Sequence, residues 1–301
     1  SLEPLQFMLP TSIAVATCQL SGIGGAALFS PIFLLGFPLL GPEYPLDSAA
    51  AAIASALLTE VFGFSSGLSG YARRGLVAWP VVSKFATISV PLAFVGALCA
   101  STVASSPGVL RTVYSLLMLS LAGFLLFAPP AESLAALSEE ECAVDDTDGA
   151  APQTVVAADG KAFTYRPPSL GGGSIGVTAG GSFLTGLLGV GVGEVLLPQL
   201  VRSCCMPLPL AAGTSVATVV FTAAAAALVQ FATLAALSAD GDLASVVPWS
   251  LVRWTIPGVL IGGQCAPLIA SRGWLSDATI ERFAATLFTL VGLAFLLATV
   301  G

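Results

Sequence analysis

Residues 186–194 read Gly-Leu-Leu-Gly-Val-Gly-Val-Gly-Glu and lie in the middle of a long apolar run, Ser174–Val201. The first eight of them include four glycines. Each glycine costs about 1 kcal/mol relative to alanine inside a helix and lets the backbone leave helical geometry. An amide without a hydrogen bond is costly in hydrocarbon, so such a break persists only where protein or water surrounds it. The stretch therefore predicts a membrane helix that is interrupted near mid-membrane.

A second stretch of this kind lies near the start of the chain, where residues 22–25, Gly-Ile-Gly-Gly, interrupt the apolar run Pro10–Leu40. In both runs a proline follows the glycines at the same spacing, Pro31 in the first and Pro198 in the second. A helix that resumes after a break presents free N–H groups and the positive end of its dipole, so two that converge would bind an anion without a basic side chain. The alternative is that the glycines only allow close packing of helices.

The composition sets the class of protein. Of the 301 residues, 56% are apolar and 9% are charged, and the mean hydropathy is +0.94, whereas an ordinary soluble domain carries about 25% charged residues. A globule of this size has too little interior to bury so many apolar side chains, which excludes a soluble enzyme. Ten Lys and Arg against 17 acids exclude a nucleic-acid binder. The lack of histidine excludes His-based triads and the common His-containing zinc sites, so we expect no catalytic residue, metal or cofactor.

Eight apolar runs predict an all-α polytopic membrane protein, since about 20 apolar residues cross a bilayer as a helix. We divide the chain into a first transmembrane repeat (residues 1–128), an acidic hydrophilic loop (129–168) and a second transmembrane repeat (169–301). The loop carries eight acids against two basic residues and few bulky apolar residues, so we expect it to be flexible and solvated. The runs are Pro10–Leu40, Asp47–Tyr71, Ala78–Val103 and Val109–Ala128, then Ser174–Val201, Leu208–Leu237, Val246–Ala270 and Ala278–Val300.

The two halves share the order of their motifs. Trp79 matches Trp249 at the start of the third run of each half, and a proline followed five residues later by glycine recurs at Pro91 and Pro257. Internal repeats are common in transporters, with the substrate site at the interface between the repeats. If every run crosses the membrane, the copies are parallel; if the first run of each half is a re-entrant hairpin, they are inverted. The sequence leaves both arrangements open.

Two acidic residues, Glu60 and Glu194, lie within the apolar runs. Carboxylates at membrane depth are costly and usually functional. Each is a proton-coupling candidate, because a protonated carboxyl group could carry a proton with the substrate. Two alternatives stay open: Glu194 could be a structural acid bonded to backbone amides, and Glu60 could lie near a membrane face and be solvated.

Glycines and neutral polar residues at the breaks are the candidate substrate-binding residues. Hydroxyl and amide side chains there could hydrogen-bond an oxyanion, although such residues also serve as glue between helices. The two prolines mark the helix breaks. The candidate substrate-binding residues are Gln19, Ser21, Gly22, Gly24, Gly25, Gly189, Gly191, Gly193, Gln199, Thr214 and Ser215, and the helix-break residues are Pro31 and Pro198.

Three motifs together resemble the sulfite exporter TauE/SafE family of membrane anion permeases: Gly22-Ile23-Gly24-Gly25 with Pro31, Gly189-Val190-Gly191-Val192-Gly193 with Pro198, and Ala212-Gly213-Thr214-Ser215. The resemblance covers nearly the whole chain except the acidic loop. It implies a transporter for small sulfur-containing or organic anions, such as sulfite or sulfonates. The residues that match the family's motifs are Gly22, Gly24, Gly25, Pro31, Gly189, Gly191, Gly193, Pro198, Gly213, Thr214 and Ser215.

We therefore expect a secondary transporter rather than an enzyme, with two halves that rock about the glycine breaks around a site near mid-membrane. Its expected partners are the lipid bilayer and a small anion, with nucleic acid excluded and with proton coupling and a homo-oligomer left open. The plasma membrane is the expected location, and an organellar membrane is the alternative. Two rival functions remain: an anion channel, and a membrane-embedded enzyme or assembly subunit that docks a partner through the acidic loop.

Overall fold

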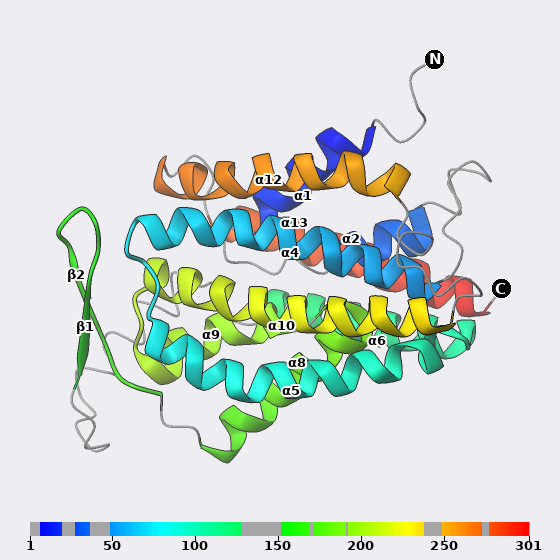
Figure 1. The fold of residues 1–301 in the computed structure, drawn as a ribbon, viewed down its shortest axis with the longest axis horizontal. Coiled ribbons are helices and arrows are strands. Elements are labelled where there is room, and N and C mark those ends of the chain that lie inside the picture. Colours follow the sequence, from blue (N-terminus) through cyan, green and yellow to red (C-terminus); the bar gives the residue numbers. More distant parts are fainter. Residues whose placement is uncertain are drawn as a thin grey trace.

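The computed structural model describes residues 7–19, 28–36, 49–127, 152–168, 171–190, 192–237, 249–272 and 277–300, which are almost entirely helical (Figure 1). The helices of the first half are α1 (Met8–Gln19), α2 (Phe29–Pro31), the π-helix η3 (Ile32–Gly36), α4 (Ala49–Arg73), α5 (Trp79–Ala104) and α6 (Pro107–Phe127). Strands β1 (Gln153–Val156) and β2 (Ala162–Tyr165) follow. The second half contains α8 (Gly172–Leu188), α9 (Val192–Cys204), α10 (Leu208–Leu237), α12 (Trp249–Arg272) and α13 (Asp277–Val300).

Three helices within the described residues, α4, α5 and α10, are long and apolar enough to cross a membrane. Shorter apolar stretches lie in α1, α6 and α13. Large apolar side chains on several helices are exposed, among them Leu116 in α6, Leu228 in α10 and Leu297 in α13. Helices that are apolar on their outward side as well as on their inward side are typical of a protein surrounded by lipid. The predicted class, a helical membrane protein, is confirmed.

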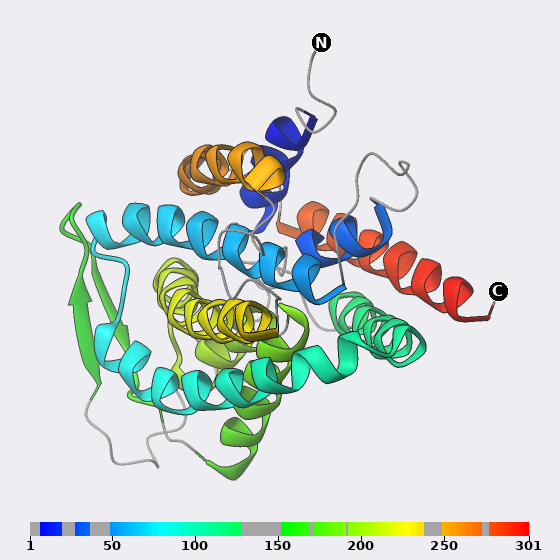
Figure 2. The same ribbon diagram turned by 45° about the vertical axis from the view of Figure 1, so that its right-hand side comes forward.

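The helices form one bundle around α4 and α10, which pack against each other (Figures 1 and 2). The long helix α12 packs on α4, and α5 packs on α10. Helix α12 also packs against α1, and α5 also packs against α8. Helices α1 and α8 are the first described helices before and after the β-hairpin. Helices α6 and α13 pack against each other at one side of the bundle (Figure 2).

Two glycines bring α12 into close contact with α1. A Cβ atom at Gly258 would lie 2.7 Å from the carbonyl oxygen of Leu9, and one at Gly262 would lie 2.6 Å from that of Ile13. No side chain fits at such distances, so these glycines have the packing role that small residues often have between membrane helices. Because the two contacts advance together along both helices, α1 and α12 run in the same direction.

Hydrogen bonds fix the direction of α4 relative to α12. The hydroxyl groups of Thr59 in α4 and Thr255 in α12 lie 3.2 Å apart. Further along both helices, the Ser66 hydroxyl donates to the carbonyl oxygen of Leu260 (2.7 Å). Helices α4 and α12 are therefore parallel, and α1, α4 and α12 all point toward the same end of the bundle.

Helices α8 and α9 form a hairpin that enters the bundle and returns. The Gln199 side chain of α9 accepts a hydrogen bond from the Thr178 hydroxyl (3.0 Å) and donates one to the carbonyl oxygen of Ser174 (3.0 Å), both in α8. These contacts place the later part of α9 beside the earlier part of α8, so the two helices are antiparallel. The interruption predicted within the run Ser174–Val201 is present, and the chain turns back there instead of continuing across.

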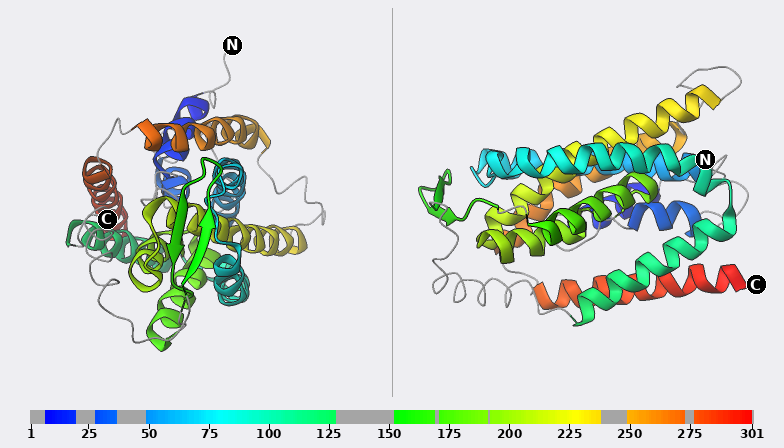
Figure 3. Two further views of the ribbon diagram at one scale, coloured as in Figure 1. Left: turned by 90° about the vertical axis from the view of Figure 1, so that its left-hand side faces the viewer. Right: turned by 90° about the horizontal axis from the view of Figure 1, so that it is seen from below.

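The loop expected to be flexible contains a feature that the sequence analysis did not predict, the antiparallel hairpin β1–β2. The Ala158 N–H donates to the carbonyl oxygen of Arg74 at the end of α4 (2.9 Å), and the Arg166 N–H donates to that of Cys204 at the end of α9 (2.8 Å). The hairpin therefore covers the end of the bundle at which α4 and α9 finish (Figure 3). It also shows that both helices finish at the same end.

Burial of one aromatic side chain anchors this hairpin. Tyr165 is 2% exposed and belongs to the same buried apolar cluster as Leu200 and Val201 of α9, and its hydroxyl donates to the Gln153 side chain (2.7 Å). Each strand has only four residues, and its contacts come from helices distant in the sequence. Strands this short could not be predicted within a segment whose acidic composition is typical of a flexible loop.

Candidate functional site

Part of the predicted site lies outside the described residues. This part consists of Ser21, Gly22, Gly24, Gly25 and Gly191, together with the side chain of Gln19, whose backbone ends α1. The residues on both sides of the second break, between α8 and α9, are described, as is the segment α2–η3 that follows the first break.

The second break is built around Gly189 and Thr185. Gly189 ends α8 with a left-handed backbone (φ +81°), a conformation that glycine adopts without the steric cost of a side chain. Its N–H donates to the carbonyl oxygen of Thr185 (2.9 Å). The Thr185 hydroxyl accepts a hydrogen bond from the N–H of Val192, the first residue of α9 (2.8 Å). Thr185 therefore ties the end of α8 to the start of α9.

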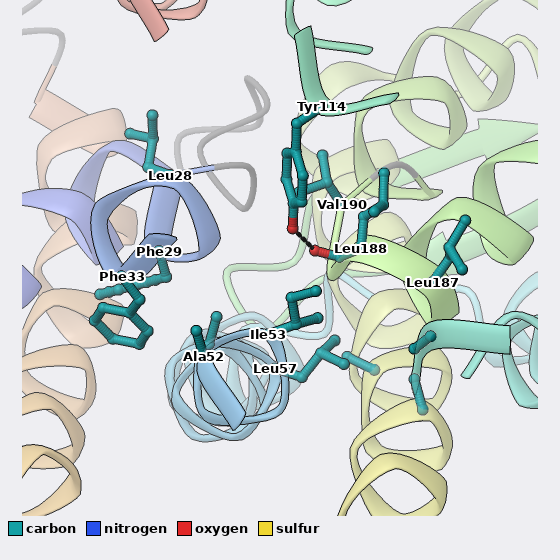
Figure 4. Packing of buried hydrophobic residues seen from close by; sticks show 14 of the residues in the cluster. Leu28, Phe29, Phe33, Ala52, Ile53, Leu57, Tyr114, Leu187, Leu188 and Val190 are labelled. Atoms are coloured by element: carbon teal, nitrogen blue, oxygen red, sulfur yellow. Dashed lines mark hydrogen bonds between the residues drawn. The ribbon is translucent and has the colours of Figure 1, made fainter. Parts of the chain in front are cut away.

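Two side chains from other helices hydrogen-bond the last carbonyl groups of α8, which lack partners within their own helix. The Gln230 amide of α10 donates to the carbonyl oxygen of Gly186 (2.6 Å). The Tyr114 hydroxyl of α6 donates to the carbonyl oxygen of Leu188 (Figure 4). Such partners allow a break to persist inside a membrane protein, because unsatisfied backbone groups there are costly.

The segment after the first break meets the second break. A Cβ atom built on Gly189 would lie 2.9 Å from the hydroxyl oxygen of Ser30, in α2, and 3.5 Å from the side chain of Leu57, in α4. Figure 4 shows the buried apolar residues around this contact, with Phe29 on one side, Leu188 on the other, and Ile53 and Leu57 of α4 below them. The segment α2 of the first run and the break of the second run therefore come together beside α4.

Both predicted proton-coupling candidates lie at this meeting point. Glu60 is 1% exposed and Glu194 is 8% exposed, and their carboxyl groups are close enough to interact electrostatically. Glu60 follows Leu57 by one helical turn and so lies on the same face of α4, the face that contacts the break. Glu194 lies in the first turn of α9. Glu60 is therefore buried, and it is not the solvated residue that the sequence left as an alternative.

Basic side chains are not part of this arrangement. No lysine or arginine whose side chain the structure describes is buried. The first turn of α9 instead offers backbone N–H groups and the positive end of the dipole of a helix of 13 residues. An anion near the break would be held by these groups and by hydroxyl groups, next to two acids.

The other predicted residues of the second run are distributed along α9. Gly193 is in its first turn, where a Cβ atom would lie 3.3 Å from Val219 of α10. Pro198 lies inside the helix, and Pro31 lies buried in α2. Gln199 is used between α8 and α9, through its bonds to Ser174 and Thr178, so its described contacts are within the hairpin.

Thr214 and Ser215 lie in the first part of α10, before the turn of that helix that meets Gly193. The Thr214 hydroxyl accepts a hydrogen bond from the Ala78 N–H at the start of α5 (3.1 Å) and donates to the carbonyl oxygen of Leu210 (2.7 Å). A side chain at the adjacent Gly213 would overlap the carbonyl oxygen of Leu76. These contacts join α10 to the connection between α4 and α5. Ser215 is buried.

Three residues at the break were not predicted from the sequence: Thr185, Gln230 and Tyr114. Gln230 had a signal, because it is an amide side chain within the apolar run Leu208–Leu237. Thr185 also had a signal, because it is a hydroxyl side chain directly before the glycine cluster. Tyr114 gave no signal, since one tyrosine in an apolar helix is common and its partner is 74 residues away in the sequence.

Comparison with known proteins agrees with the resemblance of the motifs. No curated protein and no solved structure matches the chain. The model of one protein family, described as sulfite exporter TauE/SafE, matches residues 10–295, which is nearly the whole chain and includes both interrupted runs. The protein is therefore an integral membrane protein, and the chain belongs to the sulfite exporter TauE/SafE family of transporters.

Proposed function

We propose that the protein is a secondary transporter of small sulfur-containing or organic anions, such as sulfite or sulfonates, in the plasma membrane or an organellar membrane. Its site lies where the two interrupted runs meet, near mid-membrane, and protons move with the anion. The observation that carries this proposal is the contact between Ser30 after the first break and Gly189 at the second. Sites between repeats, built from discontinuous helices, are a recurring design of transporters.

The directions of the helices support an inverted repeat, an arrangement that many transporters use to move a substrate between their two halves. Helix α9 finishes at the end of the bundle that carries the β-hairpin, and α8 is antiparallel to α9, so α8 enters from that end. Helix α1 runs parallel to α4, which finishes at the hairpin, so α1 enters from the opposite end. The pairing of α5 with α8 is matched by that of α12 with α1. We therefore take the halves as inverted copies, each with one re-entrant hairpin and three full crossings.

The acids at the break explain why a proton would accompany the anion. Glu60 and Glu194 are both buried, and two neighbouring buried carboxyl groups cannot both ionise without a large electrostatic cost, so this pair is the place where we propose that the coupled proton binds. An anion bound at the first turn of α9 adds a further negative charge in a region where no lysine or arginine with a described side chain is buried. A proton on the pair offsets part of this charge, so anion and proton bind together.

The test is flux in proteoliposomes of the purified full chain, with sulfite, sulfate, sulfoacetate and a carboxylate offered in parallel under an imposed pH gradient. We expect saturable uptake of at least one of the sulfur anions, driven above equilibrium by the gradient. Either Glu60→Gln or Glu194→Gln should remove the effect of the gradient and retain anion binding. Asp159→Asn, which removes an exposed acid of the β-hairpin, is the matched control and should behave as wild type.

Two results would contradict the proposal. Flux that never exceeds equilibrium and does not saturate would indicate an anion channel instead. An unchanged pH dependence in both glutamine variants would show that the acid pair does not carry the coupled proton, even if the anion is transported.

A further inference from the structure

Tyr114 links the pair α6–α13 to the break, although it lies in neither interrupted run. It is fully buried, and its ring stacks on that of Phe295 in α13, with ring centres 5.1 Å apart. Its hydroxyl reaches across to the carbonyl oxygen of Leu188, the last residue of α8 (Figure 4). A residue of the first half therefore holds the backbone of the second half at the site.

The same hydroxyl lies at the meeting point of the two runs. It is within interaction reach of the Ser30 hydroxyl and close enough to Glu60 to interact with it electrostatically. Ser30 in turn faces Gly189, the residue after Leu188. The Tyr114 hydroxyl is thus close to Ser30 in α2, to Leu188 at the end of α8, and to Glu60 in α4.

The bond to Leu188 has a structural reason to be strong. Leu188 is fully buried, and its carbonyl group lies at the end of α8, where no later N–H of the same helix can reach it. Gly186 is served by Gln230 from α10 of the same half. Among the described residues, the Tyr114 hydroxyl is the one group that donates a hydrogen bond to the carbonyl oxygen of Leu188. Without the hydroxyl, the buried carbonyl group would be left without this partner, which is costlier than losing an exposed bond.

We propose that Tyr114 is a positioning residue of the transport site: its hydroxyl fixes where α8 ends, and so where the first turn of α9 presents its N–H groups to the anion. The identity of the substrate rests on the proposed function, but the position of the end of α8 and of the start of α9 does not depend on the substrate. If the halves move relative to each other during transport, this bond between them is one that the motion must break and remake.

The test compares Tyr114→Phe, which keeps the stacked ring and removes the hydroxyl, with Tyr71→Phe, which removes the hydroxyl of another buried tyrosine, in the last turn of α4 near the β-hairpin. Hydrogen exchange of the purified full chains without substrate is the first readout. We expect amides of residues 186–195 to exchange faster in Tyr114→Phe and to be unchanged in Tyr71→Phe. Equal exchange in these residues for wild type and Tyr114→Phe would overturn the proposal, whether or not the protein transports sulfite.

Sulfite flux in proteoliposomes is the second readout. We expect KM to rise about tenfold in Tyr114→Phe, the effect of one hydrogen bond at a buried group, with Vmax within about twofold of wild type. A role in stability alone predicts a lower melting temperature and a lower Vmax with KM unchanged, and that pattern would contradict the positioning role. If wild type moves no anion at all, the proposed function fails, while the exchange experiment still decides the role of Tyr114.

Discussion

The Ser30 hydroxyl oxygen lies 2.9 Å from the position that a Cβ atom of Gly189 would occupy. The two residues are far apart in the sequence and belong to different halves of the chain. Gly189 ends α8 at the second break, and Ser30 lies in α2, after the glycines at which the first break is predicted. Their contact brings α2 of the first apolar run against the break of the second, two runs that share the order of their motifs. It leaves room at Gly189 for a hydrogen atom but not for a side chain.

Gly189→Ala should therefore impair both the fold of the break and transport. The left-handed backbone costs a residue with a side chain about 1–2 kcal/mol, and the new methyl group would also displace the Ser30 hydroxyl. We expect a lower melting temperature and a sulfite flux that falls by about tenfold or more, since 1.4 kcal/mol corresponds to a factor of ten. Both are measured on the purified protein, the flux in proteoliposomes.

Gly180→Ala is the matched control for this change. Gly180 lies in the same helix, α8, and a Cβ atom there meets nothing within 4 Å. Alanine is also the better helix former at such a position. The control should keep the flux of wild type and have an equal or higher melting temperature. A Gly189→Ala variant with the flux of its control would show that the contact with Ser30 does not matter for transport.

Thr185→Val should weaken the connection between α8 and α9. Valine has nearly the shape of threonine but cannot accept the hydrogen bond of the Val192 N–H, which leaves a buried donor without this partner at a cost of about 1–3 kcal/mol. We expect faster hydrogen exchange at residues 192–195 and a reduced flux. Thr222→Val is the control, because Thr222 is also buried and its hydroxyl donates, among the described residues, to the carbonyl oxygen of Thr218 in its own helix. Equal behaviour of the two variants would argue against a special role of Thr185.

Gly75→Val should release the β-hairpin from the bundle. Gly75 has a left-handed backbone (φ +70°), and a Cβ atom there would lie 3.1 Å from the backbone of Ala157 in the hairpin. Trypsin should then cut faster after Lys161, which limited proteolysis followed by mass spectrometry measures. Gly108→Val, at a glycine whose Cβ would meet nothing within 4 Å, is the control. Unchanged cleavage in Gly75→Val would mean that this glycine does not hold the hairpin in place.

The sequence predicts the elements of this fold better than their contacts. The glycine cluster before Glu194 locates the second break, because repeated glycines inside an apolar run have a clear physical consequence for a membrane helix. Three of the predicted runs, Asp47–Tyr71, Ala78–Val103 and Leu208–Leu237, contain described helices that are long and apolar enough to cross a membrane. The direction of the chain after the break could not be predicted, since a returning and a continuing helix have the same composition; the contacts of Gln199 with α8 decide it.

The candidate site was predicted in part. Gly189, Gly193 and Glu194 lie together at the second break, as expected of residues beside one glycine cluster. Glu60 of α4 lies close to Glu194, which the sequence alone did not indicate. Thr214 was grouped with them because of its motif, yet its hydroxyl serves the start of α5. Tyr114 was missed because its role depends on a partner in the other half, and a single sequence carries no signal of such a pair.

The most direct test of the central claim is a crystal structure of the protein soaked with selenite, the selenium counterpart of sulfite, with the ion located by its anomalous signal. We predict one selenium peak between the Ser30 hydroxyl and the first turn of α9, next to Gly189 and facing Glu60. A peak only at the membrane faces, or within the bundle but away from residues 189–194, would contradict the account.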